Sequence, residues 1–310
     1  MASINDLATA AIASSSSTST SPPPAAGAQS QPQPQPAAGA PRGAFIVLEG
    51  LDRSGKTTQV KLLEQRFVEA GRSVKVMRFP DRSTPIGQMI DAYLKSDVAM
   101  EDHVIHLLFS ANRWEAAAQI SSLLAAGTTI LCDRFHLSGI AYSAAKRNPS
   151  LPLPWAAAPE RGLPRPDLVL FLDLDERAAR ARGGFGDERY ERAAMQARVR
   201  DIFCAMAAGA DEEPSESLPS AGDAGGAGVA GGSADPPPAG TGAAAVAEST
   251  SPPQQQQRQQ HTPRRTGEHI LVVDAGASVE AVADEIWRRV EARVRQVDAG
   301  ELGASVGVVE

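Results

Sequence analysis

The chain has 310 residues, of which 30 are basic and 37 acidic, and the formal net charge of −7 argues against binding to a nucleic acid polymer. Its two cysteines form no disulfide or metal-binding pattern, which indicates a reducing compartment. No apolar run approaches the roughly 20 residues that span a bilayer, so we expect no membrane partner.

Two long segments have compositions that cannot build a core. Residues 1–41 and 210–265 consist largely of Ala, Ser, Pro, Gly and Gln and contain no aromatic residue. Such segments bury too little apolar surface to offset the entropy lost on ordering, so both are predicted to be disordered. The rest suits one α/β domain, residues 42–209 with 266–300, followed by a flexible tail at 301–310.

The first of these segments also bears on location in the cell. It is rich in Ser and Ala and poor in acidic residues, as organelle transit peptides are, but it lacks Arg. We expect a cytoplasmic protein, with the nucleus, a mitochondrion or a plastid as alternatives.

Strands and helices alternate along the remaining sequence. Strands are predicted at residues 44–48, 73–79, 128–132, 166–173 and 269–273, and helices after 57 and at 85–95, 101–126, 175–182, 188–208 and 279–294. The alternation predicts right-handed crossovers and a five-stranded parallel sheet with helices on both faces. Ligands of such sheets bind at the carboxyl ends of the strands.

The first strand leads into a phosphate-binding loop. Residues 50–57 read G-L-D-R-S-G-K-T, which matches G-x-x-x-x-G-K-[ST] between a strand and a helix. Glycines let the backbone turn its N–H groups onto phosphate oxygens, and the following helix adds partial positive charge. Lys56 would reach the β- and γ-phosphates, and the Thr57 hydroxyl could bind Mg²⁺. The loop therefore predicts a nucleoside triphosphate.

Two further features sit close to this loop. Arg53, inside the loop, could act as an arginine finger supplied in cis, with a solvated side chain as the alternative. Asp133 and Arg134 follow the third strand. Asp133 could hold Mg²⁺ through water or orient Arg134, and a purely structural ion pair is the alternative.

Candidate acceptor groups follow the second and third strands and lie on the long helix. Arg82 and Arg134 could each bind a phosphate monoester through two charge-assisted hydrogen bonds. Because the carboxyl ends of parallel strands share one edge, these arginines should meet the phosphate loop in one crevice. Phe109 and Arg113 share a helix face and could bind a base, although their spacing alone favours a core Phe and a surface Arg.

Six motifs, taken together and in order, resemble the thymidylate kinase family, whose members make dTDP from dTMP and ATP. They are residues 47–57, 78–84, 101–103, 107–115, 133–135 and 166–172. The resemblance runs from about Arg42 to Met206 and resumes near His269. It implies a P-loop nucleoside monophosphate kinase fold with a short lid, ATP as co-substrate, Mg²⁺, a homodimer and a place in dTTP biosynthesis.

The resemblance also assigns residues to the two substrates. The ATP site would comprise Gly50, Leu51, Asp52, Arg53, Ser54, Gly55, Lys56, Thr57, Thr58 and Arg182. The dTMP site would comprise Asp52, Phe79, Arg82, Phe109, Arg113, Arg134, Ser138, Gly139, Tyr142 and Tyr190. The catalytic residues would be Arg53, Lys56 and Asp133, and Thr57 and Asp133 would hold Mg²⁺, either directly or through water.

Individual roles follow from the same resemblance. Phe109 would stack on thymine and Arg113 would bind its edge. Arg82 and Arg134 would hold the monophosphate, and Asp52 would bind the 3′-hydroxyl of the sugar.

The lid of the family corresponds to residues 182–191. Arg182 would stack on adenine, and Arg189 is predicted to be a solvated lid charge because Arg53 supplies the catalytic cation. Tyr142 would crowd the 2′ position and so favour deoxyribose. The chain departs from the family pattern at Phe135, where Tyr is usual, and at Ala277, where relatives often carry Lys.

Three other functions are alternatives to phosphorylation of dTMP. A kinase of dUMP or dCMP is the nearest alternative, since one methyl group on a base changes binding by only about 1–3 kcal/mol. A GTP-hydrolysing switch is opposed by the lack of an Asn-Lys-x-Asp motif. A catalytically inactive scaffold would be expected to lack Arg53, Lys56 or Asp133, and all three are present.

Overall fold

The computed structural model describes residues 41–175, 178–179, 188–209 and 270–310. These residues belong to one of the two units into which the chain divides, and the other, Ser215–Arg264, lies outside them. Also outside lie most of the helix predicted at 175–182 and nearly all of the two segments predicted to be disordered. None of the helices in the described part of the chain is long and apolar enough to cross a membrane.

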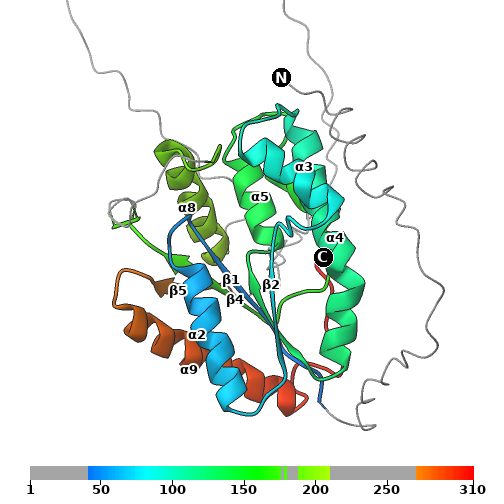
Figure 1. Ribbon diagram of the computed structural model, residues 1–310, viewed down its shortest axis with the longest axis vertical. Coiled ribbons are helices and arrows are strands. Elements are labelled where there is room, and N and C mark those ends of the chain that lie inside the picture. The colour runs from blue at the N-terminus through cyan, green and yellow to red at the C-terminus, as the bar shows by residue number, and fades with distance from the viewer. Residues whose placement is uncertain (1–40, 176–177, 180–187, 210–269) are drawn as a thin grey trace, which may run out of the picture. The chain divides into compact units, whose positions relative to one another are not determined.

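A five-stranded parallel sheet forms the centre of the described residues (Figure 1). Its strands are β1 (Phe45–Gly50), β2 (Val74–Arg78), β3 (Thr129–Asp133), β4 (Leu168–Asp173) and β5 (Ile270–Asp274), in the order β2-β3-β1-β4-β5. Asp133 pairs in register with Leu48 of β1 and Arg78 of β2. The carboxyl ends of these three strands therefore lie at one edge, as predicted.

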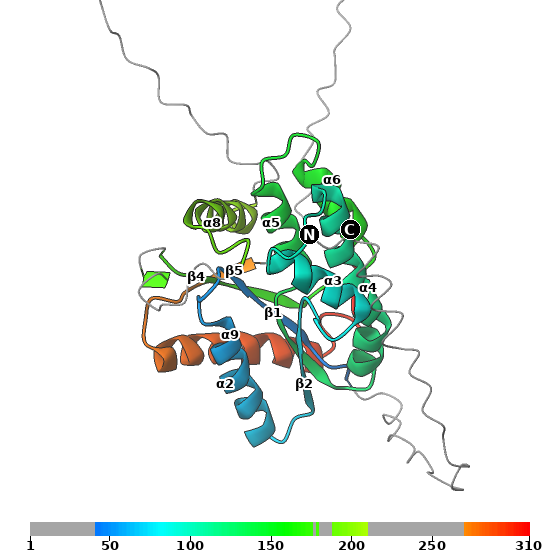
Figure 2. The same cartoon turned by 45° about the horizontal axis from the view of Figure 1, so that its top comes forward.

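Helices cover both faces of the sheet (Figure 2), and alternate residues of β1 pack against the two layers. On one face, α2 (Lys56–Glu69) and α9 (Val279–Asp298) cover Ile46 and Leu48 of β1. On the other face, α4 (Asp102–Ala125), α5 (His136–Ala144) and α8 (Ala193–Ala207) cover Phe45 and Val47. This two-sided burial explains why β1 is apolar at every position before Glu49 instead of alternating.

Several helices differ from the sequence-based prediction. Helix α5, the short α6 (Leu153–Ala157) and the 3₁₀ turn η1 (Ala158–Glu160) were not predicted. Almost every residue of α5 is buried, so its sequence shows no amphipathic period. Its N-cap residue, Phe135, also makes no capping side-chain hydrogen bond. The helix predicted at 188–208 begins only at Ala193. Helix α3 (Pro85–Leu94) lies where a helix was predicted, and it packs on α4 through a small cluster centred on Ile90 and Ile105.

The last residues of the described chain differ from the flexible tail that the sequence predicts at 301–310. Residues 306–309, called the closing segment below, pair with the loop between η1 and β4 through backbone hydrogen bonds and one antiparallel bridge. Val306 and Val309 also pack against the core on the α4 side of the sheet. The tail was misjudged because its partners lie more than 140 residues earlier in the sequence.

Candidate active site

The phosphate loop has the geometry that its motif predicts. Gly50 and Gly55 adopt φ values of 154° and 99°, and a Cβ at Gly50 would lie 2.9 Å from the Leu172 carbonyl oxygen. Gly55 is the N-cap of α2 and offers no side-chain hydrogen bond, so the first amides of the helix remain free for an anion. The loop is therefore shaped by backbone constraints that only glycine meets.

Lys56 is buried at the centre of this loop. Its Nζ donates to the carbonyl oxygens of Gly50 at 3.1 Å and Leu51 at 2.6 Å. Burial and the nearby Arg134 cation together lower the pKa of Lys56 to about 7, against the opposing effect of the Asp52 carboxylate. A triphosphate bound beside Lys56 would raise this pKa again by favouring the ammonium form.

Thr57 and Asp133 meet where the sequence places a Mg²⁺ site. The Thr57 hydroxyl donates to Asp133 Oδ2 at 2.7 Å. Asp133 Oδ1 is buried and has no hydrogen-bond partner in the described part of the chain. A buried carboxylate oxygen beside a hydroxyl suits a hard cation or one of its water ligands. Arg134 forms its ion pair with Asp52, so the structure gives no direct support to the alternative in which Asp133 orients Arg134.

Two clefts flank the loop and share one wall. The donor cleft is lined by residues 52–59 of the phosphate loop and α2, and by Ala275, Ala277, Val279 and Val282. Glu188 and Glu191 line the acceptor cleft together with all ten predicted dTMP residues, which are Asp52, Phe79, Arg82, Phe109, Arg113, Arg134, Ser138, Gly139, Tyr142 and Tyr190. Asp52, Arg78 and Arg134 line both clefts. The predicted convergence on one crevice is therefore confirmed.

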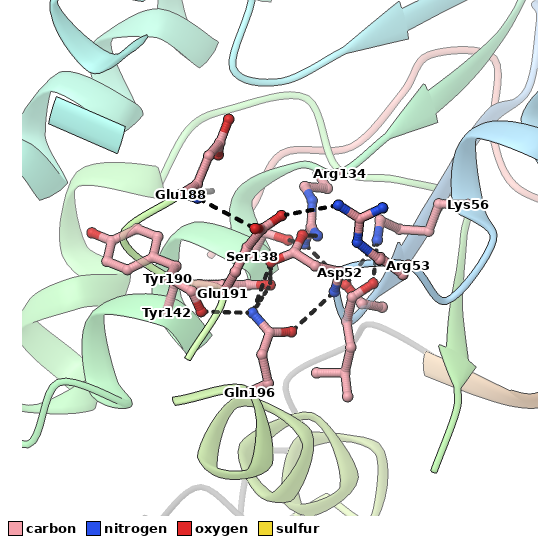
Figure 3. Close-up of polar contacts among 12 residues, drawn as sticks. Asp52, Arg53, Lys56, Arg134, Ser138, Tyr142, Glu188, Tyr190, Glu191 and Gln196 are labelled. Carbon is pink, nitrogen blue, oxygen red and sulfur yellow. Dashed lines mark hydrogen bonds and ion pairs between the residues drawn. The ribbon is translucent and has the colours of Figure 1, made fainter. Parts of the chain in front are cut away.

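A polar network joins the phosphate loop to the acceptor cleft (Figure 3). Arg134 Nη2 donates to Asp52 Oδ1 at 2.5 Å, and its Nη1 donates to the Gly50 carbonyl oxygen at 2.9 Å. Gln196 rises from α8 and donates to Asp52 Oδ2 at 2.7 Å. Burial raises the pKa of Asp52, but the Arg134 and Lys56 cations outweigh it and hold the pKa below its usual range. Asp52 is thus an anion facing the cleft.

Both arginines predicted to hold the acceptor phosphate are paired with carboxylates in this structure. Arg134 pairs with Asp52, while Arg82 contacts Asp91 at 2.5 Å and Glu188 at 2.8 Å. A phosphate entering the cleft would compete with these carboxylates for the guanidinium groups. Glu188 lies within the predicted lid, so the acceptor phosphate and the lid would share Arg82.

Phe109 and Arg113 occupy the inner end of the acceptor cleft. Phe109 is half-buried and lines the cleft, whereas the Arg113 side chain is only 2% exposed. Arg113 Nε donates to Glu160 Oε2 at 2.8 Å, and its Nη2 donates to the other oxygen of that carboxylate. The spacing argument for a surface Arg is therefore wrong, because a buried counter-ion from η1 stabilises it.

Arg53 and the predicted lid residues differ in how well the structure agrees with the sequence-based predictions. Arg182 lies outside the described residues. Arg53 has φ of 66° and a side chain 34% exposed, with Nη2 3.8 Å from Glu191 Oε1. Arg189 was predicted to be solvated, but it donates to the carbonyl oxygens of Tyr93 and Val98, and its guanidinium carbon lies 4.3 Å from the centroid of the Tyr93 ring. That prediction is corrected.

Two buried residues shape the site and were missed as site residues by the sequence analysis. Glu49 is fully buried and accepts hydrogen bonds from the amides of Phe135 and Ser138 and from the Ser138 hydroxyl. It thereby positions the start of α5, and burial raises its pKa. Gln196 could not have been found either, because its partner Asp52 is 144 residues away. The Phe135 ring packs against Phe45 and Phe79, which places this departure from the family pattern in the aromatic core beside the site.

A parallel sheet with a phosphate loop, and with a second cleft of arginines and one aromatic beside it, defines the class of P-loop nucleoside monophosphate kinases. The profile of the thymidylate kinase family matches residues 48–216. This chain belongs to the thymidylate kinase family.

Individual relatives agree with this assignment. A thymidylate kinase of Arabidopsis thaliana is 52% identical over 163 residues, which is 53% of this chain and 61% of the relative. A thymidylate kinase of Homo sapiens is 49% identical over 164 residues, 53% of this chain and 76% of the relative. A solved thymidylate kinase structure from Candida albicans superposes with a TM-score of 0.61 at 32% identity, covering 87% of this chain and 99% of the other.

Proposed function

We propose that the two clefts hold the two substrates of one phosphoryl transfer, MgATP in the donor cleft and dTMP in the acceptor cleft. As a member of the thymidylate kinase family, the chain phosphorylates dTMP to dTDP, a step of dTTP biosynthesis. The observation that carries the proposal is the shared wall of the clefts, where Asp52, Arg78 and Arg134 line both. A kinase of dUMP or dCMP is not favoured by the relatives.

Catalysis in this arrangement rests on positioning and charge neutralisation. The loop amides and Lys56 would hold the β- and γ-phosphates, and Arg134 and Arg82 would hold the acceptor phosphate. Arg53 lies on the loop between the clefts and would place a cation on the transferring group. No covalent intermediate is required, because the acceptor oxygen can attack in line when both substrates are held.

Thr57 and Asp133 are the residues proposed to hold Mg²⁺, and the unpartnered Asp133 Oδ1 supports that assignment. When bound there, Mg²⁺ would supply positive charge that offsets the charge of the phosphates. The described residues hold no group of three or more His, Cys, Asp or Glu that could bind a metal by themselves.

The acceptor cleft would recognise the nucleoside through three kinds of contact. Phe109 would stack on thymine, Arg113 would donate to its edge, and the ionised Asp52 would accept from the 3′-hydroxyl. Tyr142 lies against Arg134, with its ring centroid 5.3 Å from the guanidinium carbon, and would crowd a 2′-hydroxyl. These contacts would favour a pyrimidine deoxynucleotide over a ribonucleotide.

We also propose that the chain forms a homodimer through α4. Val104, Leu107 and Trp114 lie on one side of this helix and are 42–47% exposed, an unusual exposure for large apolar residues so close in space. A second copy could cover this face symmetrically. The compartment is proposed to be a reducing one such as the cytoplasm, since Cys132 and Cys204 are both free thiols.

An ADP-release assay across nucleoside monophosphates tests the proposed function. We expect dTMP to give the highest kcat/KM, with weaker activity on dUMP and little on AMP or dGMP. Phe109→Ala should raise KM for dTMP roughly tenfold through lost stacking and leave KM for ATP unchanged. Val68→Ala, at a position 62% exposed on α2 that lines neither cleft, is the control. Equal turnover of purine and pyrimidine monophosphates would contradict the assignment of the acceptor cleft.

A further inference from the structure

The guanidinium of Arg113 is held in one position by its surroundings. Arg113 and Glu160 have side chains only 2% and 0% exposed, and the carboxylate takes both Nε and Nη2. The backbone of α5 also approaches the guanidinium closely, since a Cβ at Gly139 would lie 2.4 Å from Arg113 Nη2 and 3.1 Å from Nη1. Arg113 is therefore confined by a counter-ion and a helix backbone while it lines the acceptor cleft.

Glu160 does not itself line the acceptor cleft. It sits on η1, and η1 is bound to the helix that carries Arg113. The Pro159 carbonyl oxygen accepts from Ser110 Oγ at 3.1 Å and from Trp114 Nε1 at 2.8 Å. The carboxylate and the guanidinium thus approach each other from two elements that are already joined.

The closing segment holds the other side of this turn. Val309 accepts from the Gly162 N–H at 2.8 Å and donates to the Leu163 carbonyl oxygen at 2.8 Å, and the Arg165 N–H donates to the Gly307 carbonyl oxygen at 2.9 Å. In both overall views, the end of the chain marked C lies beside α4 (Figures 1 and 2). The loop that follows Glu160 is therefore paired along its length with residues from the far end of the chain.

We propose that Glu160 is a positioning residue for base recognition, which fixes Arg113 at the inner end of the acceptor cleft, and that the closing segment holds the loop carrying Glu160. The inference rests on the proposed contact between Arg113 and the base. A buried, neutralised guanidinium keeps a fixed hydrogen-bonding fork, whereas an unpaired one would move toward water or take up another partner. Glu160 would therefore affect binding of dTMP but not of ATP.

Glu160→Gln is the first test, because Gln keeps the shape and removes the charge. In the full chain we expect KM for dTMP to rise about tenfold, with kcat and KM for ATP within about twofold. Parallel rises in both KM values, or an unchanged KM for dTMP in a folded variant, would overturn the proposal. Thermal melting of each variant establishes that it is folded.

A double-mutant cycle separates this inference from the proposed function. If Glu160 acts through Arg113, then Glu160→Gln should change KM for dTMP less than about twofold in an Arg113→Met background. An undiminished effect in that background would overturn the inference alone. If Arg113→Met leaves KM for dTMP unchanged, the proposed base contact fails, and the inference fails with it.

Deletion of residues 306–310 tests the second half of the proposal without touching the buried ion pair. We expect KM for dTMP to rise about threefold and KM for ATP to stay unchanged. Val308→Ala is the matched control, since its side chain is 54% exposed and the backbone pairing is retained. An unchanged KM for dTMP in the folded deletion variant would show that the closing segment does not hold Glu160.

Discussion

Lys56→Met should inactivate the enzyme and yet stabilise the nucleotide-free protein at pH 7. Lys56 carries an ammonium group in a buried position, and burial lowers its pKa to about 7 from the ordinary value of 10.5. Met has a similar length and no charge, so it removes the cost of burying the ion. The loss of activity follows because the substitution removes the cation that is proposed to hold the β- and γ-phosphates.

The magnitude follows from the two pKa values of Lys56. The difference between pKa values of about 7 and 10.5 corresponds to about 4 kcal/mol at pH 7. Loss of the hydrogen bonds to the Gly50 and Leu51 carbonyl oxygens costs about 1 kcal/mol each. The net expectation is therefore that Lys56→Met is more stable than the unmodified chain by about 2 kcal/mol at pH 7.

The pH dependence has a definite sign. Between about pH 7 and 10.5 the unfolded chain binds more protons at Lys56 than the folded one, so the stability of the unmodified chain rises with pH. The advantage of Lys56→Met should shrink by about 2 kcal/mol between pH 7 and pH 9. Below pH 7 the full penalty of the buried ammonium is present in the unmodified chain.

Urea unfolding in phosphate-free buffer at pH 7 and pH 9 measures both quantities. Lys61→Met is the matched control, because Lys61 is exposed on the same helix. Its free energy of unfolding should equal that of the unmodified chain at both pH values. The reasoning is refuted if Lys56→Met is less stable than the unmodified chain at pH 7 and the difference does not vary with pH.

Three further predictions concern other parts of the chain. Arg53→Ala should lower kcat by roughly 10²–10³-fold in steady-state assays, because it removes a cation beside the transferring group, and an unchanged kcat would contradict this role. Deleting residues 210–265, with a short linker in their place, should keep kcat/KM within several-fold, since loop-closure entropy changes slowly with length; an inactive but folded deletion protein would show that the insertion has a role. Leu107→Glu should shift the sedimentation of the protein from dimer to monomer, whereas Val68→Glu, at a position 62% exposed on α2, should not.

Much of the donor side could be predicted from the sequence because its constraints are local. Eight contiguous residues, 50–57, contain the glycines, the lysine and the hydroxyl that a phosphate loop needs, and the strand and helix around them have clear apolar patterns. Predicting that the acceptor arginines lie beside this loop required one more inference. The alternation of strands and helices implied a parallel sheet, and a parallel sheet brings the ends of β1, β2 and β3 to one edge.

Other parts of the fold could not be predicted in this way. Helix α5 is buried on nearly all sides and so lacks an amphipathic period, although it supplies Ser138, Gly139 and Tyr142 to the acceptor cleft. Arg189 was misjudged because its partners are backbone carbonyl oxygens about 90 residues earlier, which carry no sequence signal.

The sequence alone determined the parallel α/β fold, the phosphate loop and the set of cations around it, because each depends on local pattern or on the order of elements. Only the tertiary structure decided how those cations are neutralised. Arg113 meets Glu160 across 47 residues and Arg134 meets Asp52 across 82. A buried charge is stable only beside its counter-charge, and which residue serves is settled by how the helices pack.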